Sequence, residues 1–195
     1  MPAQCKTLFV EIEEPWQRDY LEKKIEGICS ARFEACKSQD IQAVQKGVEV
    51  LSVFVNSRVT EKDFARFPDL RLIATRSTGF DHIDLKAASA KGIQVANVPV
   101  YGENTVAEHA FALILSLARN LRKSYFKTRE GDFSLDGLMG FDLNGKTLGV
   151  VGTGHIGLHV IRMAKGFGMN ALAFDVKENS SVADALGFKY VPLDE

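Results

Sequence analysis

Along the first half of the chain, short apolar runs alternate with helix-like segments. Such runs predict buried strands, and the segments between them predict helices. Strands are expected at residues 8–10, 31–35, 48–55, 70–74 and 93–98, and helices at 15–27, 60–67 and 84–91. The run at 48–55 is almost continuously apolar, which is typical of a parallel strand covered on both faces. Strands that alternate with helices indicate a doubly wound α/β unit built on a parallel sheet.

The pattern changes at residues 98–102, which are expected to form a hinge between two domains. A long helix is expected from about Thr105 to Lys123, because its apolar residues recur at helical intervals. Thr105 and Glu108 have the spacing of a capping box at the start of that helix. An irregular arm or loop is expected next, at 128–144. After it, strands are expected at 148–151, 171–174 and 190–191, and a short helix at 182–186.

A glycine turn follows the predicted strand at 148–151 and opens a helix. The residues are Gly152, Thr153, Gly154, His155, Ile156 and Gly157, with the spacing G-x-G-x-x-G. Gly152 permits the tight turn, Gly154 lets the backbone approach a diphosphate, and Gly157 lets the helix pack on the sheet. The unpaired N–H groups at the helix start attract phosphate charge. These six residues therefore predict a dinucleotide site. The alternative is an ordinary βαβ turn whose glycines serve packing alone.

An acidic residue, Asp175, ends the next predicted strand, at 175 − 157 = 18 residues after Gly157. A carboxylate at this place accepts hydrogen bonds from ribose hydroxyls and repels a 2′-phosphate, which favours NAD over NADP. Val176 is expected beside it in the cofactor site. His155 lies inside the turn, so its backbone N–H and its ring are expected near the diphosphate.

Composition narrows the class of protein. Hydrophobic residues make up 46% and charged residues 25% of the 195 residues, and the formal net charge is −1. This balance gives no electrostatic reason to expect nucleic acid or an anionic membrane as partner. The apolar stretch at 110–118 is far shorter than the ~20 residues of a membrane span, and the N-terminus lacks the apolar core of a signal peptide. A cytoplasmic globular protein is expected.

Three cysteines, Cys5, Cys29 and Cys36, are an odd number without C-x-x-C spacing. This pattern favours reduced thiols with structural roles over metal ligands or catalytic groups. No metal site is predicted.

Two more segments, TRSTGFDHID at 75–84 and NVPVYGENTVAEHA at 97–110, precede the glycine turn. In this order the three motifs resemble the D-isomer-specific 2-hydroxyacid dehydrogenases, and within that family the D-lactate dehydrogenase branch. The resemblance covers essentially the whole chain. It implies a flavodoxin-like substrate domain at 1–98 and the first, incomplete part of a Rossmann NAD-binding domain at 99–195. It also implies a homodimer formed through the helix at 105–123.

The resemblance places the carboxylate of a small 2-oxo acid against the loop after the fourth strand. The loop residues are Ser77, Thr78, Gly79 and Phe80. The residues support this independently, since Gly79 permits a turn whose N–H groups form a nest for a small anion. The alternative is a plain strand-to-helix turn in which Asp84 caps the next helix, and both can hold together.

Three further residues take roles from the resemblance. Tyr101 is placed near the substrate and Val106 beside the nicotinamide, and each has an alternative role in packing. His109 follows Glu108 directly, which suggests an acid–base pair. Neighbours on a helix point about 100° apart and do not face each other, so His109 is expected to be structural.

The implied reaction converts a 2-oxo acid, NADH and a proton to the D-2-hydroxy acid and NAD, with pyruvate and D-lactate as the expected pair. Enzymes acting on phosphoglycerate, glycerate, formate and phosphite share this scaffold.

The family catalyses the reaction with an arginine and with a histidine supported by a glutamate. No residue here matches these three, which are expected beyond Glu195. The chain therefore resembles an N-terminal portion with little or no activity of its own. The alternative is a non-catalytic NAD-binding sensor or a co-repressor-like interaction module on the same scaffold.

Overall fold

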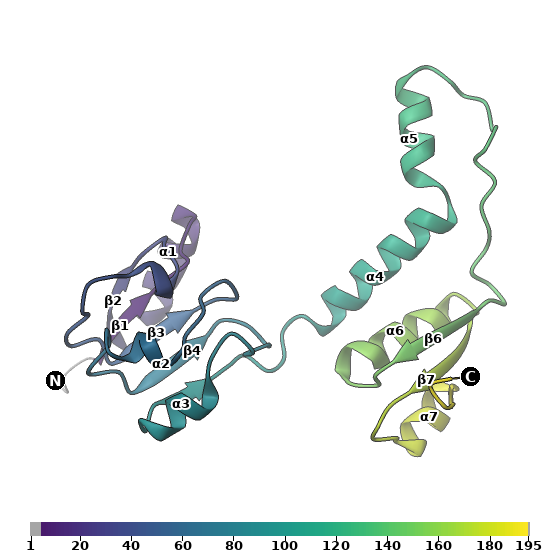
Figure 1. The fold of residues 1–195 in the computed structure, drawn as a ribbon. Helices are drawn as coiled ribbons and strands as arrows, with labels where there is room; N and C mark the ends of the chain where they lie inside the picture. The colour runs from purple at the N-terminus through teal and green to yellow at the C-terminus, as the bar shows by residue number, and fades with distance from the viewer. Residues whose placement is uncertain (1–4, 195) are drawn as a thin grey trace. The chain divides into compact units, whose positions relative to one another are not determined.

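The computed structural model describes residues 5–194. The chain divides into two compact units, and the boundary along the chain lies between Tyr101 and Gly102. The first four residues, part of the segment where no signal peptide is expected, lie outside the described residues. The assignment of residues 1–98 and 99–195 to a substrate domain and an NAD domain stays a prediction. Each unit is described by itself (Figure 1).

The first unit is built on a five-stranded sheet in the order β2-β1-β3-β4-β5, with every neighbouring pair parallel. Its strands are β1 (Cys5–Phe9), β2 (Cys29–Phe33), β3 (Val50–Val53), β4 (Leu72–Thr75) and β5 (Gln94–Ala96). Its helices are α1 (Pro15–Ile25), α2 (Glu61–Phe64) and α3 (Leu85–Ala90), with a 3-10 turn at Ser38–Asp40. This strand order is that of flavodoxin-like folds, so the predicted fold class is confirmed.

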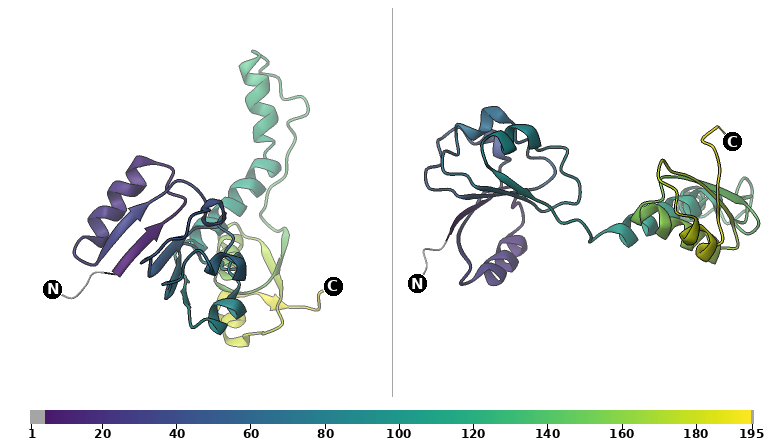
Figure 2. Two further views of the ribbon diagram at one scale, coloured as in Figure 1. Left: turned by 60° about the vertical axis from the view of Figure 1, so that its left-hand side comes forward. Right: turned by 90° about the horizontal axis from the view of Figure 1, so that it is seen from below.

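Helices cover both faces of this sheet, with α1 on one side and α2 and α3 on the other (Figure 2). The buried core lies on the side of α2 and α3. It contains Leu8, Leu51, Val53, Phe64, Phe67, Ile73 and Ile83 among its members. On the opposite side, α1 buries no residue completely, and its Trp16 and Tyr20 are 65% and 57% exposed. The helix is therefore where the sequence predicted it, but these two apolar side chains are not part of the core.

The second unit contains a three-stranded parallel sheet in the order β6-β7-β8. Its strands are β6 (Thr147–Val151), β7 (Asn170–Phe174) and β8 (Lys189–Tyr190), and its helices are α4 (Glu103–Ala118), α5 (Leu121–Arg129), α6 (His155–Gly166) and α7 (Ser180–Leu186). The strand, glycine turn, helix and strand predicted from the sequence are all present. Helix α4 packs on α6, where Phe111 stacks on Phe167 with ring centroids 5.3 Å apart.

The single long helix expected at 105–123 is wrong, because the structure divides it into α4 and α5. Asn120 interrupts the helix with a left-handed backbone (φ 51°). The carbonyl of Ala118 accepts a hydrogen bond from the N–H of Phe141 at 3.0 Å, and the Asn120 amide donates to the carbonyl of Met139 at 2.9 Å. A Cβ on Gly140 would lie far inside van der Waals contact with that Ala118 carbonyl. The returning segment thus approaches α4 closely and ends it, a tertiary contact that no local periodicity reveals.

The expected capping box at Thr105 and Glu108 is also wrong. Helix α4 begins two residues earlier, at Glu103, after Gly102 in the N-cap position. The Glu108 carboxylate instead accepts a hydrogen bond from the side chain of Asn104. Between residues 5 and 194, no helix combines the length and apolar character needed to cross a bilayer.

Candidate functional site

The glycine turn of the second unit connects β6 to α6. Gly152 has a backbone φ of 96°, a conformation that favours glycine. Its N–H donates to the carbonyl of Phe174 at 2.7 Å, which ties the turn to the end of β7. The sequence predicted this tight turn from Gly152, and the backbone geometry confirms it.

Gly157 lies in the first turn of α6 and is confined by the chain itself. A Cβ at this position would meet the carbonyl oxygen of Gly152 far inside van der Waals contact, and would touch a methyl group of Val150 at 3.4 Å. The close packing expected of Gly157 is therefore confirmed. Only a residue without a side chain lets the helix start this near to the strand that precedes it.

Gly154 has a different environment. It occupies the N-cap position with φ −68° and ψ −171°, and a Cβ there would meet nothing within 4 Å. Neither strain nor packing requires glycine here, so its absent side chain leaves open space in front of the turn. The first helical hydrogen bond of α6 is donated by the N–H of Leu158 to the carbonyl of Gly154, at 3.0 Å. Among the described residues the N–H groups of His155, Ile156 and Gly157 have no acceptor, as at helix starts that bind anions.

Asp175 lies just beyond β7 and is held beside the turn. Its carboxylate accepts the N–H of Thr153 at 2.6 Å, the hydroxyl of Thr153 at 3.0 Å and the N–H of Lys177 at 3.0 Å. The hydrogen bond from the Lys177 N–H is the largest cause that lowers the pKa of Asp175 below its usual value, and the bond from the Thr153 N–H is the next. The group is therefore a fixed anion at neutral pH, and its neighbour Val176 points into solvent, 94% exposed.

Tyr190 on β8 completes this network, and sequence reasoning missed it. Its hydroxyl lies 2.8 Å from the hydroxyl of Thr153 and accepts the N–H of Asn179 at 3.2 Å. No motif spacing connects positions 153 and 190. Only the pairing of β8 with β7 brings the ring to the turn, where it braces Thr153 and thereby Asp175.

The start of α4 lies next to the start of α6. Glu103 Oε1 is 3.4 Å from Nδ1 of His155, and the His155 side chain is 79% exposed. Glu103 Oε1 is buried and has no hydrogen-bond partner in the described part of the chain. The sequence did not connect these residues, which are 155 − 103 = 52 positions apart. Val106 and Ile156, two other expected cofactor contacts, are exposed on the same two helix starts.

In the first unit, the predicted carboxylate loop follows β4. The Ser77 hydroxyl is buried, donates to the carbonyl of Gly79 at 2.7 Å and lies 2.6 Å from the Thr75 hydroxyl. The Thr78 hydroxyl donates to the carbonyl of Val98 at 3.0 Å. Both hydroxyls thus shape the loop, and each uses its single proton on a backbone carbonyl of the protein, so neither has a proton to donate to a carboxylate.

The backbone of this loop remains available. Within residues 5–194, no acceptor is found for the N–H groups of Thr78, Gly79 and Phe80. Gly79 is not in the left-handed region, so its backbone conformation is one that other residues also adopt. Asp84 accepts the N–H of Ala87 at 3.0 Å, so the helix-capping alternative holds, and the nest for a small anion stays a prediction. Tyr101, the other expected substrate residue, is exposed at the end of the unit.

Arg76 comes directly before this loop in the chain, and its guanidinium is hydrogen-bonded within the unit. Arg76 donates to the carbonyl of Val10 at 2.7 Å and to the Ser52 hydroxyl at 3.0 Å. Burial lowers the pKa of Arg76, and the charge of Glu11 opposes that shift. Since its guanidinium donates to groups of the protein itself, Arg76 supports the loop and is not placed to bind a ligand.

Glu11 holds the neighbouring loop after β3. Its carboxylate accepts the N–H groups of Phe54 at 2.8 Å and Asn56 at 2.9 Å. Burial acts to raise the pKa of Glu11, but hydrogen bonds from Ser57, Phe54 and Asn56 outweigh it and leave the pKa below its usual value. Glu11 has a left-handed backbone (φ 57°), which is rare for a residue with a long side chain.

Two histidines, His82 in the first unit and His109 in the second, differ in environment. His82 lies 3.2 Å from the Thr75 hydroxyl, and burial lowers the pKa of its ring below the usual value. His109 is exposed on α4. Across the described part of the chain, no group of three His, Cys, Asp or Glu side chains is arranged to hold a metal ion.

Comparison with known proteins places these features in context. The family described as D-isomer specific 2-hydroxyacid dehydrogenase, catalytic domain, matches residues 7–183. A 2-hydroxyacid dehydrogenase homolog of Haemophilus influenzae is 47% identical over 165 residues, which is 84% of this chain and 50% of that protein. The D-lactate dehydrogenase of Escherichia coli is 39% identical over 164 residues, 83% of this chain and 49% of that protein. The chain thus spans about half the length of these curated relatives.

A solved structure shows the same arrangement of elements. The D-lactate dehydrogenase from Aquifex aeolicus, complexed with NAD and lactic acid, superposes with a TM-score of 0.87 at 35% sequence identity. The match covers 96% of this chain and 56% of that protein.

The two glycines of the turn make a matched pair for a stability test. We expect Gly157→Ala to lower the free energy of unfolding of the second unit by about 1–3 kcal/mol, because the new methyl group overlaps the Gly152 carbonyl. Gly154→Ala should be nearly neutral, since its methyl group enters open space. Urea denaturation followed by circular dichroism measures both. Equal destabilisation by the two substitutions would contradict the packing described for Gly157.

Proposed function

The chain belongs to the family of D-isomer-specific 2-hydroxyacid dehydrogenases, and we propose that it forms the substrate-binding part and the first NAD-binding part of such an enzyme. The activity proposed for the whole enzyme is reversible hydride transfer between NADH and a small 2-oxo acid. The observation that carries the proposal is the glycine turn, with its free helix-start N–H groups and the anchored Asp175 beside it.

The residues of the turn fit a dinucleotide. The N–H groups of His155, Ile156 and Gly157 would bind the diphosphate, in the open space that Gly154 leaves. Asp175 would accept the ribose hydroxyls, because each carboxylate oxygen can accept more than the bonds it already has. Val106 would border the nicotinamide. When bound, NADH supplies the hydride, and the chain's own groups hold and orient the cofactor.

The loop of the first unit would bind the carboxylate of the 2-oxo acid through the N–H groups of Thr78, Gly79 and Phe80. Small carboxylates are recognised by converging N–H groups of this kind. The hydroxyls of Ser77 and Thr78 would act indirectly by holding the loop in shape. Tyr101 would contact the substrate. Pyruvate and D-lactate are the proposed pair.

Cofactor preference provides the first test. We expect the purified chain to bind NADH at least about tenfold more tightly than NADPH, because Asp175 repels a 2′-phosphate. Asp175→Asn should reduce that ratio by removing the charge while keeping an acceptor for Thr153. Fluorescence titration of both nucleotides measures this, and Asp136→Asn, at an exposed loop acid, is the matched control. Equal binding of NADH and NADPH by the unaltered chain would contradict the assignment of Asp175.

Catalysis provides a second test. Reduction of a 2-oxo acid requires a group that polarises the carbonyl and a group that protonates the developing alkoxide. No residue of this chain matches the arginine, glutamate and histidine that the family uses. We therefore expect the 195-residue chain to bind NADH without oxidising it when pyruvate is added. Absorbance at the NADH band measures this, and sustained pyruvate-dependent oxidation would show that other residues catalyse the reaction.

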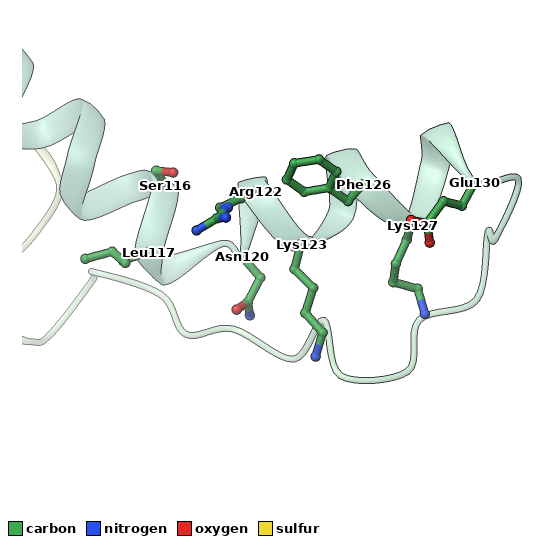
Figure 3. Close-up of a pocket in the computed structure, with 8 residues that line it drawn as sticks. All are labelled: Ser116, Leu117, Asn120, Arg122, Lys123, Phe126, Lys127 and Glu130. Atoms are coloured by element: carbon green, nitrogen blue, oxygen red, sulfur yellow. The ribbon is translucent and has the colours of Figure 1, made fainter.

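The proposed partner is a second copy of the chain. The surface concerned, here called the arm surface, comprises the end of α4, α5 and the returning segment 130–141. It exposes large apolar side chains, with Leu117 77% and Met139 95% exposed, and so much exposed apolar area is typical of an interaction site. Figure 3 shows part of it, a hollow of about 480 Å³ along α5 with Phe126 on one side and Lys123 reaching toward the returning segment.

This dimer differs from the one expected of a continuous helix at 105–123, because the arm surface bends at Asn120. Light scattering coupled to size exclusion should show a dimer. Leu117→Lys should shift it to monomer, since burying an unpaired ammonium group at an interface is costly. Val44→Lys, at an exposed apolar residue of the first unit, should not. A monomer for the unaltered chain would contradict the proposed partner.

A further inference from the structure

Two cysteines that are distant in sequence lie side by side in the sheet of the first unit. Cys5 begins β1 and Cys29 begins β2, and the two residues are directly opposed in the parallel register. Neighbouring strands lie about 4.8 Å apart, and directly opposed side chains leave a sheet on the same face. A disulfide joins Cα atoms that are roughly 4.4–6.8 Å apart. The register therefore places these two thiols within reach of each other.

The rest of this face shows that paired side chains do lie together. Phe9 and Phe33 are the pair at the other end of the same two strands, and their rings stack with centroids 5.1 Å apart. They share the face with Cys5 and Cys29 because side chains alternate along a strand. Cys5 Sγ lies 3.9 Å from the Thr7 hydroxyl, the next residue on that face.

The pair can be reached from outside. Both cysteines are free thiols and are partly exposed. Cys29 lines a groove of about 390 Å³ between β2 and α1, together with Glu22, Lys23 and Glu26 of the helix. This groove remains open because α1 buries no residue completely. A small molecule therefore has access to the Cys29 sulfur without unfolding of the sheet.

We propose that Cys5 and Cys29 form a redox-active dithiol, which a small disulfide such as oxidised glutathione converts to an intramolecular disulfide. The Cys29 thiolate attacks one sulfur of glutathione disulfide, and one glutathione leaves as thiolate. The Cys5 thiolate then attacks the Cys29 sulfur of the mixed disulfide and releases the second glutathione. Two protein thiols are oxidised, one glutathione disulfide is reduced to two thiols, and the two protons pass to the leaving glutathiones.

The product would link the edge strand β2 covalently to β1. Strand β2 pairs with β1 alone among the strands of the described sheet, so it is held by one ladder and by the thinly packed α1. A disulfide that closes the chain between residues 5 and 29 restricts the unfolded state. The modification is thus a stabilising bond in the first unit, and it does not depend on the proposed enzymatic function.

Cys36 is an internal control. It is exposed, lies beyond the end of β2 and has no cysteine opposite it. Burial and the nearby Glu34 raise the pKa of the Cys36 thiol, which lowers its thiolate fraction. An oxidant that reacted by exposure alone would nevertheless modify Cys36 first.

Peptide mapping of the unaltered chain tests the proposal. Trypsin cleaves after lysine and arginine, so the three cysteines fall in separate peptides, residues 1–6, 25–32 and 33–37. The reduced protein is treated with oxidised glutathione, free thiols are blocked with N-ethylmaleimide, and the digest is examined by mass spectrometry without reduction. We expect the peptides 1–6 and 25–32 to be linked, lighter by two hydrogen atoms than their sum, with Cys36 outside the link. The same treatment in guanidinium chloride should give a mixture of all three pairings.

Two further measurements make the outcome decisive. In a Cys36→Ser background, oxidation should raise the midpoint of thermal unfolding by roughly 5–10 °C, and dithiothreitol should reverse the rise. Cys29→Ser in the same background should abolish the shift. The proposal is overturned if Cys5 and Cys29 are both recovered blocked by N-ethylmaleimide, or if native and denatured protein give the same mixture of pairings.

Discussion

The close approach of two backbone segments at the glycine turn is the constraint on which the candidate cofactor site depends. Helix α6 begins so near to β6 that Gly157 lies against the Gly152 carbonyl. This contact fixes where the helix starts and therefore where its unpaired N–H groups lie. The hydrogen bond from Gly152 to Phe174 then fixes the turn relative to β7. Asp175, the next residue, is brought to Thr153 by that same connection.

Parallel strands explain why the functional candidates gather where they do. In each unit the chain leaves the carboxyl end of a strand, turns and enters a helix, so turns from neighbouring strands meet at one edge of the sheet. In the second unit this edge holds the glycine turn, Asp175 and Tyr190. In the first unit it holds the loop at 77–80, which is proposed to bind a carboxylate, and the two charged residues Glu11 and Arg76. Side chains there serve mainly to hold the backbone in place, and the proposed ligand contacts are made by backbone N–H groups.

The first unit is unevenly stabilised. Its apolar core is concentrated on the face covered by α2 and α3, while α1 covers the other face loosely. The loosely covered face carries the paired cysteines and the stacked pair Phe9 and Phe33. An edge strand held by one ladder gains more from a covalent link than a central strand does, because more of its stability is local.

The sequence alone determined the element order, the parallel α/β class and the glycine turn, because periodicity, glycine spacing and a terminal acid are local signals. It also indicated the family through three short motifs. Tertiary structure decided the rest. The helix breaks at Asn120 because residues 139–141 dock on the Ala118 carbonyl. Tyr190 reaches Thr153 through strand pairing, and Cys5 meets Cys29 through strand register. Each of these contacts joins residues that are far apart in the chain, so the local pattern of residues along the sequence cannot predict them.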